Sequence, residues 1–277
     1  MNLQNILNSL HEADPEFYDR TSERRSVIKN VGRVAALTAL PLAFGSLLKK
    51  AYGKTNDLIT DTLNFALTLE FLEAEFYTMA VASAGLIPAG APMGAITTIR
   101  DHENAHVAFL KQAITSSGGT PVAKPTFDFT AGNGTNNGPF AGVFSNYQLF
   151  LAVAQAFEDT GVRAYKGQAG NLMGNDAVLT AALQIHSVEA RHASHIRQMR
   201  KAVGGSLVTG NPKPWITGKE SNINSAAVQP IYDGEEVTTQ AGVNIVAGNI
   251  TAAAASESFD EPLTMAQVLA IVDPFIV

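Results

Sequence analysis

The sequence predicts an all-α protein: an up-down four-helix bundle with a long central crossover, followed by an irregular C-terminal extension that ends in a short helix. Two observations predict this fold class. Apolar residues recur at intervals of three and four along four long segments, and clusters of glycine, proline and asparagine separate these segments. The predicted helices cover about residues 57–84, 95–116, 147–169 and 176–203.

Composition sets the size of the bundle and excludes several functions. The chain has 277 residues, of which 46% are hydrophobic and 16% are charged, so it can bury one good core. A bundle of this kind takes roughly 150 residues, so we expect an N-terminal segment at 1–54, the bundle at 55–204 and an extension packed on it at 205–277. The net charge of −6 offers no basic surface for nucleic acid. The absence of cysteine excludes disulfides, thiolate metal sites and a cysteine nucleophile.

The N-terminal segment has the features of an export signal. A twin arginine at Arg24 and Arg25, two apolar residues and Lys29 precede a short apolar run at 34–48, and this arrangement resembles a bacterial twin-arginine signal. We expect delivery to the periplasm or cell envelope, with membrane contact only through this segment, because the run is too short for a comfortable span. The alternative is a buried or amphipathic N-terminal helix in a cytoplasmic protein, since no clear Ala-x-Ala cleavage site follows.

The first two predicted helices begin and end at recognisable signals. Asp57 and Asp61 lie in the first turn of the first helix, where acidic side chains favour the helix dipole. Gly85 and Pro88 end this helix. The second helix begins after a Pro-Met-Gly segment, and the glycine pair that starts at Gly118 stops it.

A long crossover joins the two helix pairs. Residues 120–146 are rich in Gly, Asn, Thr and Pro, and they must travel the length of the bundle. We expect the Phe-Asp-Phe segment at 127–129 to pin this connection to the bundle surface. After the third helix, residues 170–175 form a turn, and the glycine pair that starts at Gly204 stops the fourth helix.

The helical periodicity is lost after Gly205. Residues 206–256 hold several prolines, glycines and asparagines, with short β-like pieces such as 228–232, so we expect irregular structure laid over the bundle. A last short helix begins at Thr264, because Thr264 as N-cap with Gln267 three residues later forms a capping-box pattern. We expect this helix to pack on the bundle.

Two short motifs place a carboxylate and an imidazole three residues apart. Glu103 and His106 lie in the second predicted helix, and Glu189 and His192 lie in the fourth. Because a helix turns about 100° per residue, each pair shares one helix face, which is a metal-ligand spacing. One such pair alone is most often an exposed contact between neighbouring turns, so the repetition is what makes the pattern informative.

A lone glutamate precedes each motif at a matching distance. Glu70 lies 33 residues before the first motif, and Glu158 lies 31 residues before the second. Each glutamate is followed seven residues later by a tyrosine, Tyr77 or Tyr165, two turns along the same stripe. Both glutamates lie among apolar residues, where a charge is costly unless it is paired or bound to a cation. The chain therefore reads as a helix pair that is repeated once.

This pattern resembles the ferritin-like di-iron carboxylate proteins, in which two helices each contribute a Glu and two others each contribute Glu-x-x-His. The resemblance implies six metal ligands in one bundle core: Glu70, Glu103, His106, Glu158, Glu189 and His192. It implies two iron ions, with manganese, a mixed pair or zinc as alternatives, bridged by Glu103 and Glu189 and each bound by one histidine. Tyr77 and Tyr165 would lie behind these ligands.

The same resemblance implies chemistry with oxygen. A pair of ferrous ions with open positions suits ferroxidase activity or the reduction of dioxygen or peroxide. Residues 69–77 and 259–264 look like the ferritin-like-domain proteins related to desiccation-associated proteins, which favours a role in stress protection. Rubrerythrin is a weaker match because its cysteine-rich module is absent. The alternative class is a non-enzymatic protective or binding bundle with structural metal or none. A dimer is compatible with either class.

Glu73 is the alternative to Glu70 as a ligand, because it lies one turn further along the same helix. Glu70 is preferred for two reasons. Its counterpart in the second half of the repeat is Glu158, whereas the counterpart of Glu73 is Gly161, and only Glu70 has the tyrosine at the repeated distance. Glu73 would otherwise be a carboxylate behind the ligands.

A different reaction class follows from a second pattern at the same place. His102, Glu103 and His106 match H-E-x-x-H, in which two histidines bind zinc and the glutamate is the general base of a metalloprotease. The fourth helix has Val188 where this motif needs the first histidine. A metalloprotease also has no reason to repeat the lone glutamates, so the di-metal interpretation is preferred.

Overall fold

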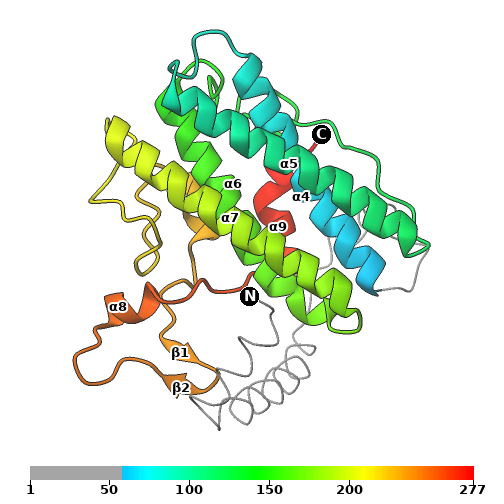
Figure 1. The fold of residues 1–277 in the computed structure, drawn as a ribbon. Helices are drawn as coiled ribbons and strands as arrows, with labels where there is room; N and C mark the ends of the chain where they lie inside the picture. Colours follow the sequence, from blue (N-terminus) through cyan, green and yellow to red (C-terminus); the bar gives the residue numbers. More distant parts are fainter. Residues whose placement is uncertain (1–57) are drawn as a thin grey trace, which may run out of the picture.

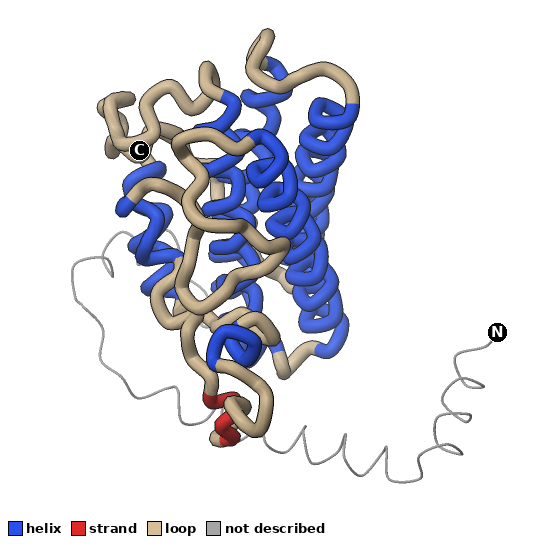
Figure 2. Tube along the Cα trace, turned by 90° about the vertical axis from the view of Figure 1, so that its left-hand side faces the viewer, coloured by secondary structure: helices blue, strands red, loops and turns tan. Residues whose placement is uncertain are grey.

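In the computed structural model, which describes residues 58–277, four long helices form a bundle and the rest of the described chain covers one side of it (Figures 1 and 2). The helices are α4 (Leu58–Ala82), α5 (Ala91–Ser116), α6 (Tyr147–Gln168) and α7 (Asp176–Val203). The all-α prediction is confirmed. The predicted export signal and the predicted helix start at Asp57 lie outside the described residues.

The bundle consists of two helix pairs that correspond to the sequence repeat. Helix α4 packs along α5, and α6 packs along α7, whereas α5 and α7 make few contacts with each other. The third helix ends one residue earlier than predicted, because the chain tightens into the 3₁₀ helix η2 (Ala169–Leu172). The second helix begins before the predicted start, since Pro92 is tolerated in a first turn where its missing N–H is not needed.

Side-chain caps explain where the second pair begins. The side chain of Asn146 accepts a hydrogen bond from the backbone N–H of Leu149, and the side chain of Asn175 accepts one from that of Val178. Each cap satisfies a backbone donor that the helix leaves without a partner. Helix α7 ends at Gly204, whose φ of 64° is a left-handed conformation that glycine adopts without a steric cost.

An aromatic cluster holds the crossover against the bundle. The ring of Phe76 in α4 packs 5.5 Å from that of Phe129 in the crossover and 5.0 Å from that of Phe157 in α6, measured between centroids. The carboxylate of Asp128 folds the loop that follows, because it accepts hydrogen bonds from the backbone N–H groups of Thr130 and Gly134, both at 3.0 Å. The predicted anchoring role of residues 127–129 is confirmed.

The C-terminal extension carries only short elements. They are η3 (Ala226–Ile231), the antiparallel strands β1 (Thr239–Gln240) and β2 (Val243–Asn244), α8 (Ala252–Ser256), α9 (Met265–Val272) and η4 (Asp273–Phe275). The capping box predicted at Thr264 and Gln267 is present at the start of α9. The β-like interpretation of 228–232 is wrong: these residues lie in η3 and its end, which buries Val228 and Ile231 three residues apart against the core.

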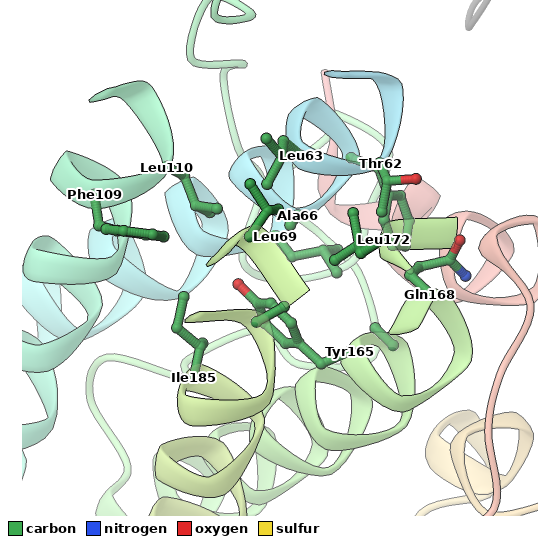
Figure 3. A pocket seen from close by; sticks show the side chains of 14 residues that line it. Thr62, Leu63, Ala66, Leu69, Phe109, Leu110, Tyr165, Gln168, Leu172 and Ile185 are labelled. Carbon is green, nitrogen blue, oxygen red and sulfur yellow. The ribbon is translucent and has the colours of Figure 1, made fainter. Parts of the chain in front are cut away.

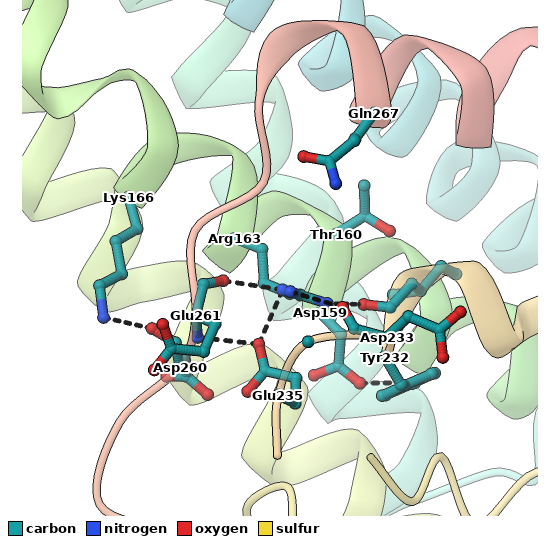
Figure 4. Close-up of polar contacts among 12 residues, drawn as sticks. Asp159, Thr160, Arg163, Lys166, Tyr232, Asp233, Glu235, Asp260, Glu261 and Gln267 are labelled. Carbon is teal, nitrogen blue, oxygen red and sulfur yellow. Dashed lines mark hydrogen bonds and ion pairs between the residues drawn. The ribbon is translucent and has the colours of Figure 1, made fainter. Parts of the chain in front are cut away.

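Buried charges fasten the extension to α6 (Figure 4). Arg163 of α6 forms an ion pair with Glu235 at 2.7 Å, and its Nε donates to the backbone carbonyl of Glu261 at 2.7 Å. Next to it, Asp159 accepts a hydrogen bond from Tyr232 at 2.7 Å and pairs with Arg197 of α7. These side chains are almost fully buried, so removing one partner would leave a charge without compensation.

The apolar helices of the described chain are core helices of this bundle. None of the helices within residues 58–277 combines the length and the hydropathy that a membrane span requires.

Candidate metal centre

Six acidic and imidazole side chains from the four bundle helices meet in the centre of the core. They are Glu70 of α4, Glu103 and His106 of α5, Glu158 of α6, and Glu189 and His192 of α7. The four glutamates are 0% exposed, and the two histidines are buried. The helices carry these groups inward because the same faces bear the apolar residues that close the bundle.

The six side chains form two overlapping groups that could each hold a metal ion. One group contains Glu70, Glu103, His106 and Glu189, and the other contains Glu103, Glu158, Glu189 and His192. Within each group the candidate ligand atoms all lie within 4.8 Å of one another. Glu103 and Glu189 belong to both groups, which is the arrangement that two metal ions bridged by two carboxylates require.

The histidines present their Nδ1 atoms to the carboxylates. His106 Nδ1 lies 3.0 Å from Glu103 Oε2 and 3.2 Å from Glu70 Oε2. His192 Nδ1 lies 2.9 Å from Glu103 Oε1 and 3.3 Å from Glu158 Oε2. Both histidines therefore approach Glu103, and each also approaches the lone glutamate of its own half.

Each tyrosine of the repeat supports the glutamate of the opposite half. Tyr77, from the helix of Glu70, donates a hydrogen bond to Glu158 Oε1 at 2.5 Å. Tyr165, from the helix of Glu158, donates one to Glu70 Oε1. These bonds occupy one oxygen of each lone glutamate and leave the other oxygen for the cluster. The sequence predicts tyrosines behind the ligands, but the exchange between halves follows only from the way α4 and α6 cross.

Several buried atoms of the cluster have no hydrogen-bond partner among the residues that the structure describes. They are Glu103 Oε1, Glu158 Oε2, both carboxylate oxygens of Glu189, and His192 Nδ1. Buried polar atoms without partners are rare and costly. A metal ion between them satisfies these atoms, since carboxylate oxygens and imidazole nitrogens are ligands of iron, manganese and zinc. The residues present thus fit a pair of metal ions.

Burial and mutual repulsion raise the pKa values of three carboxyl groups of the cluster, those of Glu103, Glu158 and Glu189. Burial, reinforced by the neighbouring glutamates, raises the pKa of Glu103 and of Glu189 well above its ordinary value. Burial raises the pKa of Glu158 to about 8, although its hydrogen bonds oppose the shift. Metal binding must displace these protons, so it is linked to pH.

The two histidines respond to the cluster in opposite ways. Burial alone would lower the pKa of His106, but its contacts with Glu103, Glu189 and Glu70 outweigh burial and raise it well above the usual value. Burial lowers the pKa of His192 to about 4, and the charge on His106 adds to this effect. Without metal, one imidazolium therefore compensates the acidic cluster.

Glu73 lies beside the cluster but in neither metal-binding group. Its carboxylate is buried, its Oε1 has no hydrogen-bond partner within the described chain, and burial raises its pKa well above the ordinary range. Glu70, not Glu73, is the α4 glutamate in the groups that could bind metal. Gly161, the repeat counterpart of Glu73, has a different role: a Cβ there would lie 3.1 Å from Glu189 Oε2, so the glycine leaves room for that carboxylate.

His102 contacts the outer side of His192. Its Nδ1 lies 2.9 Å from His192 Nε2, and the two rings stack with centroids 5.2 Å apart. Neither group of residues 58–277 that could hold a metal ion contains His102. His102, the first histidine of the H-E-x-x-H pattern, is thus placed to orient the ring of His192. The sequence did not predict this contact, because the two histidines lie 90 positions apart in different helices.

The comparison with known protein families agrees with this geometry. The family model described as ferritin-like domain matches residues 59–202. This range contains the four bundle helices, apart from the first residue of α4 and the last residue of α7. The chain therefore belongs to the ferritin-like domain family. No curated protein matches the chain.

Proposed function

We propose that this protein binds two divalent metal ions, iron in the first place, in the six-residue cluster and uses them to reduce peroxide or dioxygen. The observation that carries the proposal is the pair of overlapping groups, whose buried carboxylate oxygens include four without a hydrogen-bond partner in the described chain. The ligands are Glu70, Glu103, His106, Glu158, Glu189 and His192, with Glu103 and Glu189 shared by both ions.

Charge balance favours two divalent ions. Four ionised glutamates carry four negative charges, and two neutral imidazoles add none, so two divalent cations make the buried cluster neutral. A single ion would leave two charges uncompensated in the core. The set of oxygen and nitrogen donors without sulfur suits iron or manganese, and zinc also accepts it.

Held by these six residues, a pair of ferrous ions would supply the two electrons that, with two protons, reduce hydrogen peroxide to two waters. The chain holds the ligands in place and limits access of water. Tyr77 and Tyr165 fix the outer oxygens of Glu158 and Glu70, so that the inner oxygens face the ions. The buried carboxyl group of Glu73, whose Oε1 has no hydrogen-bond partner within the described residues and whose pKa is raised by burial and by the cluster glutamates, would deliver a proton.

A second candidate is a non-enzymatic protective bundle. It is favoured by the internal compensation of the metal-free cluster, in which a charged His106 faces three carboxylates. The extension fastened by Arg163 and Asp159 would hold the fold together in either case. Twin-arginine export of a folded, metal-loaded chain to the periplasm and a role in stress protection are compatible with both candidates.

Elemental analysis of the purified protein, grown with ample iron and manganese, separates the candidates. We expect close to two metal ions per chain, and rapid oxidation of the reduced form by peroxide or dioxygen. Glu103→Ala should lose the paired metal and the reaction while the helical circular dichroism is kept, because the apolar helix faces hold the bundle. Glu75→Ala is the matched control, since Glu75 pairs with Lys124 outside the core. Metal-free wild-type protein without redox activity would leave only the protective bundle.

A further inference from the structure

An apolar pocket lies in the bundle core (Figure 3). All four bundle helices contribute to its wall, and the residues that define it include Leu63, Ala66, Leu110, Tyr165, Ala182 and Ile185. Phe109 of α5, which is 40% exposed, also lines the pocket.

The wall of the pocket includes a residue that contacts a proposed metal ligand. Leu69, which lines the pocket, precedes Glu70 in the chain, and Ile185 lies about one helical turn before Glu189. Tyr165 connects the two sites directly, because its ring lines the pocket while its hydroxyl donates to Glu70 Oε1. A molecule in the pocket is thus separated from the cluster by a single layer of side chains.

The lining excludes charged molecules. It contains no charged side chain, so a metal cation finds no ligand there. Its polar groups are few: the Tyr165 hydroxyl is engaged with Glu70, and the carbonyl oxygen of Gln168 accepts a hydrogen bond from Asn171 at 2.9 Å. The remaining groups are the amide nitrogen of Gln168 and the Thr62 hydroxyl, which has no hydrogen-bond partner in the described chain. A buried water needs two to four polar partners, which the apolar length of the pocket does not offer.

The size of the pocket limits its occupant. Its empty volume is about 410 Å³ with the open mouth included, but the enclosed part holds little more than one molecule the size of water. An alkyl chain would require the core to move, whereas a diatomic molecule would not. Dioxygen is uncharged, apolar and small enough.

We propose that this pocket is the docking site through which dioxygen reaches the metal centre, on the side of Tyr165 and Glu70. The expected effect on the reaction rests on the proposed function, but the pocket itself is present in the metal-free protein. Peroxide is polar and hydrogen-bonds like water, so it does not share this path. Filling the pocket should therefore slow the reaction with dioxygen and leave the reaction with peroxide unchanged.

The binding site is tested first on metal-free protein with xenon, an apolar atom that enters dry protein cavities. Crystals pressurised with xenon should show one site between Ala66, Tyr165 and Ala182. Ala182→Leu, which fills the pocket from α7, should abolish that site. Ala181→Leu is the matched control, because Ala181 is the neighbouring alanine and does not line the pocket. Absence of xenon from this pocket in the wild type would overturn the proposal, whatever the metal does.

The route is tested on the reduced, metal-loaded protein by stopped-flow spectroscopy. We expect Ala182→Leu to lower the second-order rate constant for dioxygen about tenfold, with the metal content and the peroxide rate kept. Ala66→Leu, which fills the pocket from α4, should reproduce the effect if Ala182→Leu fails to fold. An unchanged dioxygen rate in a variant that excludes xenon refutes the route but leaves the proposed function standing. Wild-type protein that binds no metal refutes both.

Discussion

The unfolding free energy of the metal-free protein should fall as the pH rises from about 6.5 to 8. In the metal-free fold, burial raises the pKa of Glu158 to about 8 from an ordinary value of 4.5. A carboxyl group with a raised pKa binds its proton more tightly in the folded than in the unfolded chain. Its contribution to stability is therefore complete below pH 4.5 and is lost as the pH rises through about 8.

The magnitude follows from this window. One pH unit is worth about 1.4 kcal/mol for a group that is protonated only in the folded state. Over the interval from about pH 6.5 to 8, Glu158 alone then costs about 2 kcal/mol of unfolding free energy. Glu103, Glu189 and His106 act in the same direction, because their pKa values are also raised. His192, whose pKa falls from 6.5 to about 4, acts in the opposite direction, but only near the lower end of the window, where the unfolded imidazole still loses its proton.

Thermal unfolding followed by circular dichroism measures this effect. For a protein of this size about 2 kcal/mol corresponds to a fall in Tm of roughly 4–8 °C, to be seen with a chelator present. With manganese or iron bound the trend should reverse, since binding releases protons and tightens as the pH rises. Glu158→Gln should remove its share of the slope in the metal-free protein, whereas Glu75→Gln on the outer face of α4 should not. A metal-free Tm that stays constant or rises with pH would refute the reasoning.

Three further predictions concern other parts of the chain. His102→Ala should weaken metal binding about 10–100-fold by freeing His192, His102→Gln should recover most of it, and a metalloprotease would instead lose a single zinc. Asp159→Ala should lower the unfolding free energy measured in urea by about 3–5 kcal/mol, because it leaves a buried arginine unpaired, and a loss below about 1 kcal/mol would contradict this. Replacing Arg24 and Arg25 by lysine should hold the precursor in the cytoplasm, and unchanged delivery in cell fractionation would exclude twin-arginine export.

The helices could be predicted because their signals are local. The spacing of apolar residues repeats every three to four positions, and Asn175 and Gly204 mark the ends of α7, so its predicted and observed bounds agree. The error at 228–232 arose where local pattern and tertiary packing disagree. Valine and isoleucine there favour a strand in isolation, but Val228 and Ile231 bury on one side of a 3₁₀ turn against the bundle.

The approach of the six candidate ligands could also be expected from the sequence. A repeated Glu and Glu-x-x-His at matched distances constrains four helix faces to one core, and the structure brings these side chains together. That they bind metal is still a prediction. The apolar pocket could not be expected, since its wall combines short stretches of all four helices and no sequence pattern marks an unfilled space.

The sequence by itself determined the helices, the repeat and the inward faces, because each depends on residues within a few turns of one another. Only the tertiary structure decided which groups meet across the core. The exchange of Tyr77 and Tyr165 between the two halves, the stacking of His102 on His192 and the ion pair that Asp159 makes with α7 all join positions 38 to 95 residues apart. Such contacts depend on the crossing and rotation of packed helices, which the pattern of any single helix does not specify.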